Sequence, residues 1–399
     1  MTETIIRVAA RGDGVTASGR HVALAAPGDV IDADGEVTPG PHHQPPQCPH
    51  FPRCGGCQLQ HLDDAAYADF VRDRVSGALA AQGLEADLRP PALSPPRSRR
   101  RATLHAERRG AKLILGFSEA GSHKLVDVQD CAILHPLLMA LVAPLRRLLN
   151  DVMPPKGRAE ARMTLIDQGV DLLLVGVAAE GLSAAEKLSD FAATHRLARL
   201  ALDSGLGAET RWEPAAATVT LGGMAVGFPH GAFLQATAEG EAALVAAVRD
   251  AIGDAAMLAD LFSGIGTFAL ALSGSGKRVY AAEAARDAAL ALKLGGATRG
   301  VFADHRDLYR RPLSRGELDR FDAIILDPPR AGAREQAQEL AGSNEPVVAY
   351  VSCNPSSFAR DVKMMCDGGY RLDWVQPVGQ FRWSTHVELA ARLSRRTQG

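Results

Sequence analysis

The feature that most constrains the fold is a regular alternation of strands and helices from about residue 238 onward. Short apolar runs such as AMLADL, RVYAAE, FDAIILD and VVAYVS predict strands, and segments with helical patterning separate them. Strands that alternate with helices at this spacing are typical of a doubly wound parallel sheet. We therefore predict an α/β fold in which residues 231–399 form a Rossmann-like domain.

The part of the chain before this domain has a different pattern of apolar and turn-forming residues. Residues 1–46 contain short apolar runs interrupted by Gly and Pro, which predicts a small β-barrel module. Residues 47–230 mix apolar strands with helical segments near 63–82, 135–150 and 183–195, which predicts a mixed α+β central domain. A chain of 399 residues is long enough for these three domains.

Charge and hydropathy exclude several classes of protein. The formal net charge is −2, with 44 basic and 46 acidic residues, so a uniformly basic surface is excluded while a local basic patch is not. No stretch reaches the roughly 18 consecutive apolar residues of a membrane helix. The N-terminal segment also lacks the apolar core of a signal peptide. We expect a cytoplasmic protein with no membrane partner.

The cysteines are clustered rather than evenly distributed. Cys48, Cys54 and Cys57 lie within ten residues, and Cys131 follows much later. Without an export signal, this grouping favours a metal site over disulfide bonds. Four cysteines suit a [4Fe–4S] cluster and a tetrahedral zinc ion equally well, so their spacing leaves both open.

Glycines and acidic residues mark a nucleotide-type site in the last domain. Gly264 and Gly266 follow an apolar strand and open a helix, where the backbone can approach a ligand. Glu283 ends the next strand, where it can bind a ribose diol, and Asp304 ends the following one, where it can hold an adenine amino group. Asp327 begins Asp-Pro-Pro-Arg at the end of the fourth strand. A tight turn or a helix cap is the ordinary structural alternative for each of these positions.

Two further residues have side chains that can act in catalysis, a thiol and a carboxylate. Cys353 follows the fifth strand, at the sheet edge where Asp327 also lies. Glu388 stands between two apolar residues at the start of the last strand. Taken singly, a buried structural thiol and a surface carboxylate would explain them as well. Cys366 fits the structural interpretation, because it lies within an amphipathic helix.

Taken in order, LFSGIGTF, Glu283, LDPPRAGA, VSCNPSSFARD and STHVE resemble the motifs of the RNA uracil-C5 methyltransferases, which use S-adenosyl-L-methionine. The resemblance covers nearly the whole chain. It implies a class I methyltransferase fold for the last domain and an OB-like TRAM module for RNA binding at the N-terminus. FLQAT resembles Phe-x-Gln-x-Asn of the family, which implies that Gln235 contacts the cofactor, as do Phe262 and Thr267. The sequence departs from the family where Thr237 and Thr267 replace Asn, and where FRWST precedes His-Val-Glu.

The family chemistry assigns a role to each candidate residue. Carbon C5 of uracil is a poor nucleophile, so the Cys353 thiolate is expected to add at C6, and Glu388 to remove the C5 proton afterwards. We expect the surroundings, including Arg330, to lower the pKa of Cys353. His386 or a bound water is the alternative base. The target base is expected to be flipped out of its stack.

The resemblance also bears on the metal and on the RNA. The cysteine spacing resembles the [4Fe–4S] site of the 23S rRNA subgroup, which favours that cluster and 23S rRNA over tRNA. Residues 86–113 hold eight basic side chains, Arg99, Arg100 and Arg101 among them, and are predicted to contact RNA phosphates. We expect a monomer. The alternatives are a tRNA uridine-C5 methyltransferase, a methyltransferase of another base, and a non-catalytic iron–sulfur protein that binds RNA.

Overall fold

The computed structural model describes residues 2–274, 276–344 and 346–395. Contacts group these residues into two compact units. The first unit comprises the chain up to Tyr67, Pro95–Val219 and Arg382–Thr385. The second unit comprises Ala68–Ser94, Thr220–Phe381 and the chain from His386. The division into three domains at residues 46 and 230 stays a prediction.

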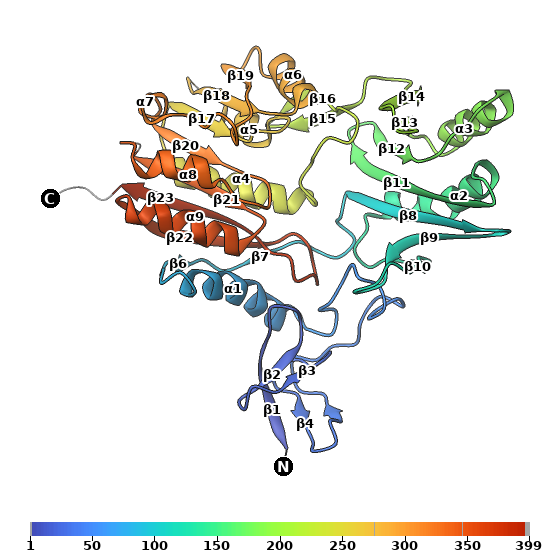
Figure 1. Ribbon diagram of the computed structural model, residues 1–399, viewed down its shortest axis with the longest axis horizontal. Helices are drawn as coiled ribbons and strands as arrows, with labels where there is room; N and C mark the ends of the chain where they lie inside the picture. Colours follow the sequence, from blue (N-terminus) through green and yellow to red (C-terminus); the bar gives the residue numbers. More distant parts are fainter. Residues whose placement is uncertain (1, 275, 345, 396–399) are drawn as a thin grey trace. The chain divides into compact units, whose positions relative to one another are not determined.

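The second unit is built on one large sheet (Figure 1). Its order is β19-β18-β17-β20-β21-β23-β22-β6, and β7 also pairs with β22. The five strands from β19 to β21 run parallel, whereas β23 is antiparallel to both of its neighbours. The strands are β6 (Asp87–Leu88), β7 (Ala92–Leu93), β17 (Met257–Leu261), β18 (Arg278–Glu283), β19 (Val301–His305), β20 (Ala323–Leu326), β21 (Val347–Ser352), β22 (Tyr370–Gly379) and β23 (Glu388–Arg395).

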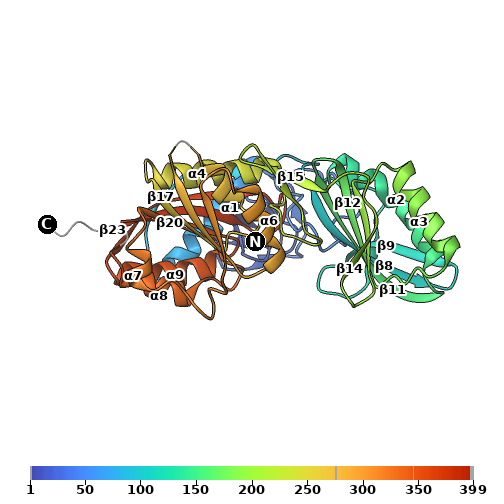
Figure 2. The same cartoon turned by 90° about the horizontal axis from the view of Figure 1, so that it is seen from above.

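Helices cover both faces of this sheet, as the buried apolar strands require. Figure 2 shows α4 on one face and α8 with α9 on the other. The helices are α4 (Ala238–Ile252), α5 (Thr267–Leu272), α6 (Arg286–Gly295), α7 (Arg315–Leu318), α8 (Arg334–Ala341) and α9 (Pro355–Asp367). The predicted Rossmann-like α/β fold is confirmed. Strand order reverses between β17 and β20, and in such sheets ligands bind beyond the carboxyl ends of the strands at this point.

Capping side chains set where two important helices begin. The Thr237 hydroxyl accepts a hydrogen bond from the Gly240 amide at 3.0 Å and starts α4. The Asn354 side chain accepts one from the Ser356 amide at 3.1 Å, and Pro355 occupies the first position of α9. The residues just before these helices are therefore held in defined positions near the carboxyl edge of the sheet.

The first unit holds two sheets. A small curled sheet has the order β3-β2-β1-β4-β5 and a core of Ile5, Ala25 and Ile31, which confirms the predicted β-barrel-like module. The larger sheet has the order β10-β9-β8-β11-β12-β13-β14, and α2 and α3 pack against one of its faces (Figure 2). The small strands are β1 (Glu3–Val8), β2 (Gly14–Thr16), β3 (His21–Val22), β4 (Val30–Ile31) and β5 (Val37–Thr38).

Along β8 and β11, the larger sheet of the first unit largely alternates buried side chains with partly or fully exposed ones, as expected for a sheet covered on one face. Its elements are β8 (Arg101–Arg109), β9 (Lys112–Ser118), β10 (Leu125–Asp127), β11 (Lys156–Ile166), β12 (Gly169–Val175), β13 (Arg199–Asp203), β14 (Ala208–Trp212), α2 (Pro136–Val152) and α3 (Leu182–Thr194). The remaining elements are the helix α1 (Asp64–Ala80) and a two-stranded sheet of β15 (Thr218–Leu221) and β16 (Met224–Gly227). Among the described residues, none of the helices has both the length and the apolar character needed to cross a bilayer.

Candidate functional site

The loop between β17 and α5 forms the first part of the site. Phe262, Gly264 and Gly266 all have positive φ angles, of 65°, 56° and 100°. A Cβ atom at Gly266 would lie 2.3 Å from a methyl carbon of Leu292 in α6, so only glycine lets the loop pass here. A non-glycine residue such as Phe262 adopts positive φ at a cost, and such strain is concentrated at functional sites.

Two of the predicted cofactor residues, Glu283 and Asp304, form hydrogen bonds that stabilise this region. Glu283 ends β18, and one of its carboxylate oxygens accepts a hydrogen bond from the Gly264 amide at 2.8 Å. The other oxygen accepts one from the Ala285 amide at 2.6 Å. Asp304 in β19 accepts a hydrogen bond from the Tyr280 hydroxyl at 2.6 Å. Glu283 therefore lies beside the glycine loop, as its predicted role requires.

The other predicted cofactor residues lie in the same unit. Gln235 is buried, and its side-chain oxygen accepts a hydrogen bond at 2.8 Å from Gln380, which directly follows β22. Gln380 in turn accepts one from the Ala236 amide at 3.0 Å, so it fixes this segment. Thr267 is the first residue of α5. Thr237, one of the departures from the family pattern, caps α4 and lies 2.7 Å from the Ser94 hydroxyl.

Two aromatic rings frame the glycine loop. The ring of Phe262 lies 5.4 Å from that of Tyr309, and the Tyr309 hydroxyl donates a hydrogen bond to the Gly332 carbonyl at 3.0 Å. Tyr309 thereby connects the glycine loop to the loop that follows β20. Sequence analysis does not point to Tyr309, because this residue belongs to no motif and its partners are distant in sequence.

Cys353 and Glu388 are brought together by strand register. In the antiparallel pair of β21 and β23, Ser352 lies opposite Leu389. The strands are antiparallel, so one position further toward this edge lie Cys353, which follows Ser352, and Glu388, which precedes Leu389. The nearby charge of Glu388 acts on the Cys353 thiol, as expected for neighbours at the edge of the sheet. Glu388 is buried, with 4% of its surface exposed, whereas His386 is exposed. Burial favours Glu388 over His386 as a group enclosed in a site.

The electrostatics of this edge are acidic. Burial raises the pKa of the Cys353 thiol to about 11, and the nearby charges of Glu388 and Asp327 add to the shift, while Arg330 acts in the opposite direction. The expectation that the surroundings lower the pKa of Cys353 is therefore wrong for the protein without ligands. Burial also raises the pKa of Asp327, with contributions from Glu388 and Asp260.

Asp260, at the end of β17, completes this acidic group. It is fully buried, and burial raises its pKa to about 7. One of its oxygens accepts a hydrogen bond from the Ala269 amide at 2.8 Å, and the other is buried without a hydrogen-bond partner among the described residues. Three carboxyl groups, of Asp260, Asp327 and Glu388, are thus gathered at this edge of the sheet, and a cationic ligand such as a sulfonium compound would favour their ionised forms.

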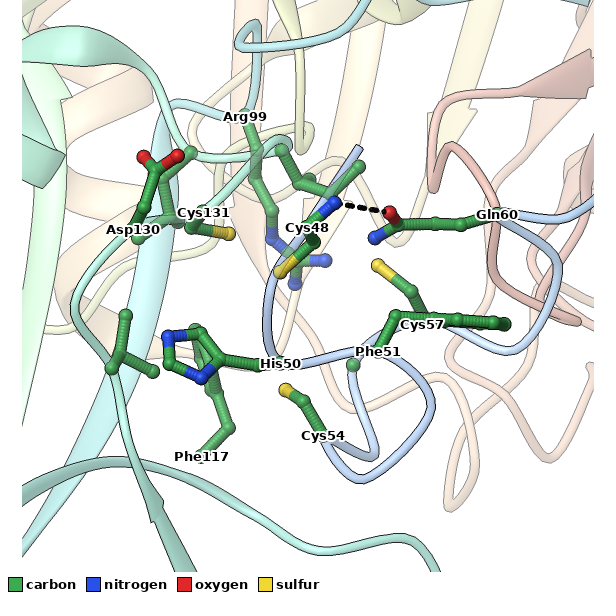
Figure 3. A pocket seen from close by; sticks show the side chains of 14 residues that line it. Cys48, His50, Phe51, Cys54, Cys57, Gln60, Arg99, Phe117, Asp130 and Cys131 are labelled. Carbon is green, nitrogen blue, oxygen red and sulfur yellow. Dashed lines mark hydrogen bonds between the residues drawn. The ribbon is translucent and has the colours of Figure 1, made fainter. Parts of the chain in front are cut away.

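The four clustered cysteines line one cavity of the first unit, with a volume of about 150 Å³. Figure 3 shows the sulfur atoms of Cys48, Cys54, Cys57 and Cys131 directed toward the space between them. The other walls are largely apolar, with Phe51, Phe117, Val128, Ile133 and Leu134. All six cysteines of the chain are free thiols, so no disulfide connects these four.

Backbone contacts attach the cysteine loop to β9 of the larger sheet. The Gly55 amide donates a hydrogen bond to the Ser118 carbonyl at 2.9 Å, and the Ala120 amide donates one to the Arg53 carbonyl at 3.1 Å. A Cβ atom at Gly55 would lie 3.0 Å from that Ser118 oxygen, so a small residue is needed here. The loop and the strand thus carry Cys54 and its neighbours to the same cavity as Cys131.

The cavity suits a positively charged group that binds thiolates. Burial raises the pKa of Cys57 to about 12 and also raises that of Cys54 and Cys131, and repulsion among the four sulfurs contributes. These raised pKa values favour the protonated thiols. A metal centre would favour the thiolates instead, because cysteine binds a metal after its thiol has lost its proton. Within the described residues, however, no three His, Cys, Asp or Glu side chains are arranged to hold a metal ion as they stand.

Arg99 lies in this cavity and not on the open basic surface that the sequence suggested. Its side chain is part of the cavity wall (Figure 3), and its Nε donates a hydrogen bond to the Arg101 carbonyl at 3.0 Å. Burial lowers the pKa of Arg99, and the neighbouring Cys57 and Cys131 offset part of that shift. Its position makes it a charge partner of the cysteines. A count of basic residues could not reveal this, because it carries no information on burial.

Comparison with known proteins identifies relatives of the whole chain. The family model described as tRNA (Uracil-5-)-methyltransferase matches residues 302–396. An uncharacterized RNA methyltransferase of Zymomonas mobilis is 50% identical over 394 residues, which cover 98% of this chain and 99% of the relative. The 23S rRNA (uracil(1939)-C(5))-methyltransferase RlmD of Shewanella piezotolerans is 31% identical over 365 residues, which cover 87% and 81% of the two chains.

A solved structure shares the fold. The tRNA (uracil-54, C5)-methyltransferase of Pyrococcus abyssi, in complex with S-adenosyl-L-homocysteine, matches with a TM-score of 0.75 and 23% identity. The match covers 98% of this chain and 99% of that one. The likeness extends over both units and confirms the predicted fold class.

Proposed function

This chain belongs to the RNA uracil-C5 methyltransferase family, and from that premise we propose that it methylates C5 of a uridine in 23S rRNA through a covalent Cys353 adduct. The observation that carries the proposal is the register of β21 and β23, which sets Cys353 beside Glu388. Asp327, at the end of the adjacent β20, shares their electrostatic environment. A nucleophile and a base at adjacent strand ends are what C5 methylation of uracil requires.

The proposed reaction proceeds in four balanced steps. The Cys353 thiol gives up its proton to water, and its sulfur forms a bond to C6 of the uracil. The electron pair of the C5–C6 double bond moves toward the C4 carbonyl, and C5 becomes nucleophilic. C5 then takes the methyl group, and the electron pair of the broken carbon–sulfur bond stays on the donor sulfur, which becomes a neutral thioether. Glu388 accepts the C5 proton, the double bond re-forms, and the sulfur leaves C6 as a thiolate.

S-adenosyl-L-methionine supplies the electrophilic methyl group of this reaction. We propose that this chain holds it with Gln235, Phe262, Gly264, Thr267, Glu283, Asp304 and Asp327. The fit is supported by the buried carboxylate oxygen of Asp260 that lacks a partner among the described residues. It is also supported by the carboxyl groups gathered at the sheet edge, because a sulfonium cation stabilises their ionised forms and the neutral thioether left after transfer does not.

We propose 23S rRNA as the substrate because a 23S rRNA methyltransferase is among the relatives that match along most of the chain. A tRNA uridine is the second candidate, which the name of the matching family model and the likeness to the Pyrococcus abyssi enzyme favour. In either case we propose that the N-terminal module of residues 1–46 helps to bind RNA and that the protein acts as a monomer.

We further propose that Cys48, Cys54, Cys57 and Cys131 bind a [4Fe–4S] cluster. Four sulfurs directed into one cavity with largely apolar walls, and with Arg99 beside them, support this proposal. The cluster would hold the cysteine loop against β9. We assign it no part in the proposed chemistry, because the nucleophile and the base are Cys353 and Glu388. A zinc ion with four thiolate ligands is the alternative.

The deciding experiment is mass-spectrometric mapping of 5-methyluridine in 23S rRNA and tRNA from a deletion strain and its complemented control. Loss of one 23S rRNA modification that the wild-type gene restores and the Cys353→Ala gene does not is the expected result. Loss of a tRNA modification instead would establish the second candidate. Unchanged 5-methyluridine in both RNAs would refute the proposal. In vitro, tritium release from C5-labelled uridine RNA separates C5 methylation from methylation at any other atom.

A further inference from the structure

Side chains of α9 hold the loop that follows β20. We call residues Asp327–Ala333 the Arg330 loop. The Arg330 carbonyl accepts two hydrogen bonds, one from the Asn354 side-chain amide at 3.0 Å and one from the Ser357 hydroxyl at 3.1 Å. Asn354 is the N-cap residue of α9, directly after Cys353, and Ser357 lies in the first turn of the helix. Hydrogen bonds therefore connect the Arg330 loop to the segment that carries the Cys353 thiol.

Asp361 is the centre of this arrangement. It is fully buried, and one carboxylate oxygen accepts hydrogen bonds from the Ala333 amide and from the Tyr350 hydroxyl, both at 2.7 Å. The other oxygen accepts from the Arg360 guanidinium at 2.6 and 2.8 Å. That guanidinium also donates to the Ala331 carbonyl at 3.0 Å. One buried carboxylate thus connects β21, α9 and the Arg330 loop.

The loop comes so close to this carboxylate that only glycine fits at the contact. Gly332 has a φ of 85°, and a Cβ atom there would lie 2.5 Å from the Asp361 oxygen. The Gly332 carbonyl accepts the hydrogen bond from Tyr309 on the other side. The loop is therefore held from two directions, and its backbone has little freedom to move away from α9.

The charges around Cys353 give this rigidity a chemical consequence. Glu388 from β23 and Asp327 from the Arg330 loop both oppose ionisation of the thiol, as does burial. Arg330 is the cation that favours the thiolate. The attraction between the Arg330 guanidinium and the thiolate weakens as the distance between them grows, so the position of Arg330 affects the ionisation of Cys353.

We propose that Asp361 is a positioning residue for methyl transfer, because it fixes the backbone of the Arg330 loop so that the Arg330 guanidinium stays near Cys353 and stabilises its thiolate. The inference rests on the proposed role of Cys353 as nucleophile. Asp361 itself touches no reacting atom. Its removal should therefore change the ionisation of Cys353 and leave the base and the methyl donor site in place.

The test measures ionisation of Cys353 directly, without RNA or methyl donor. The full-length protein and its Asp361→Asn and Tyr350→Phe variants are alkylated with iodoacetamide between pH 7 and 10, and the Cys353 peptide is quantified by mass spectrometry. We expect alkylation of Asp361→Asn at pH 8 to be about tenfold slower, which corresponds to a pKa higher by about one unit. Tyr350→Phe removes one hydroxyl from a packed ring, so it should fold normally and give a smaller loss in the same direction.

Two further variants make the result decisive. Arg330→Met should show the largest loss. Lys363→Met removes a charge from the exposed side of α9, where Lys363 pairs with Asp367, and should match the wild type. Equal pH profiles for wild type, Asp361→Asn and Tyr350→Phe would overturn the proposal, as would an Arg330→Met variant that behaves like wild type. A further slowing when Asp361→Asn is added to Arg330→Met would also overturn it, because Asp361 would then not act through Arg330. Full methylation by Cys353→Ala would instead refute the proposed function, and the alkylation result would still stand.

Discussion

Replacing Glu388 with Gln should change two steps of the reaction in opposite directions. The substitution keeps the size of the side chain and its hydrogen-bonding capacity, but removes the negative charge and the base. In the ligand-free protein the pKa of Cys353 is about 11, so at pH 8 roughly one thiol in a thousand is ionised. Glu388 is the largest cause of this shift after burial. Without its charge the pKa falls, and each unit of the fall makes tenfold more thiolate.

The later step should become slower. Loss of a general base typically costs about 10²–10⁴ in rate. Addition of Cys353 to C6 is therefore expected to be faster in the Glu388→Gln variant, while removal of the C5 proton and release of the thiol almost stop. The methylated adduct accumulates because it forms readily and decays slowly.

The assay is a denaturing gel of protein mixed with substrate RNA. We expect a shifted protein–RNA band for Glu388→Gln that requires S-adenosyl-L-methionine and is absent when Cys353→Ala is added to the variant. Alkylation of Cys353 in the free variant should be faster than in wild type at the same pH. Turnover at the wild-type rate with no trapped adduct would refute the assignment of Glu388 as the base. Slower alkylation would refute the electrostatic reasoning.

Three further predictions follow from the cysteine cavity and the acidic sheet edge. Protein purified without oxygen should be brown with about four irons per chain, and Cys131→Ala should lose the metal; colourless protein with one zinc ion would contradict the cluster. Arg99→Met should lose iron to a chelator faster than wild type, because a positive charge beside the thiolates is removed, whereas Arg158→Met, an exposed arginine of β11, should not; equal rates would show that Arg99 has no such role. Because burial raises the pKa of Asp260 to about 7, the folded protein keeps a proton that the unfolded chain loses, and stability should fall as pH rises from about 4 to 7. Asp260→Asn should lack this fall and gain up to about 4 kcal/mol above pH 7, and thermal denaturation at pH 5 and 8 would disprove this if both proteins showed the same pH dependence.

Much of the fold could be predicted because the governing interactions are local. Apolar runs of strand length, helical patterning between them and Gly or Pro at the turns are visible in any short window, and they predicted the Rossmann-like domain that the structure has. The helix predicted at 63–82 forms as Asp64–Ala80, and the Asp63 side chain caps its start by accepting a hydrogen bond from the Ala66 amide at 2.8 Å.

The candidate site, too, could be predicted only in part from the sequence. Sequence position and residue chemistry made Cys353, Glu388 and the four clustered cysteines candidates, and the resemblance to a known family gave them their predicted roles. They could not determine the ionisation of Cys353. A pKa depends on burial and on charges brought close by strand register, and those charges come from residues as far apart as Asp327 and Glu388.

By itself, then, the amino-acid sequence determined which strands and helices form, which loops contain chemically active residues and which family the motifs resemble. Only the tertiary structure decided that Arg99 faces the cysteines instead of solvent, that Gln380 holds Gln235, and that Asp361 connects Tyr350 to the Arg330 loop. The physical reason is that a side chain's type is a local property, whereas its burial and its partners arise when segments far apart in the chain pack together and exclude water.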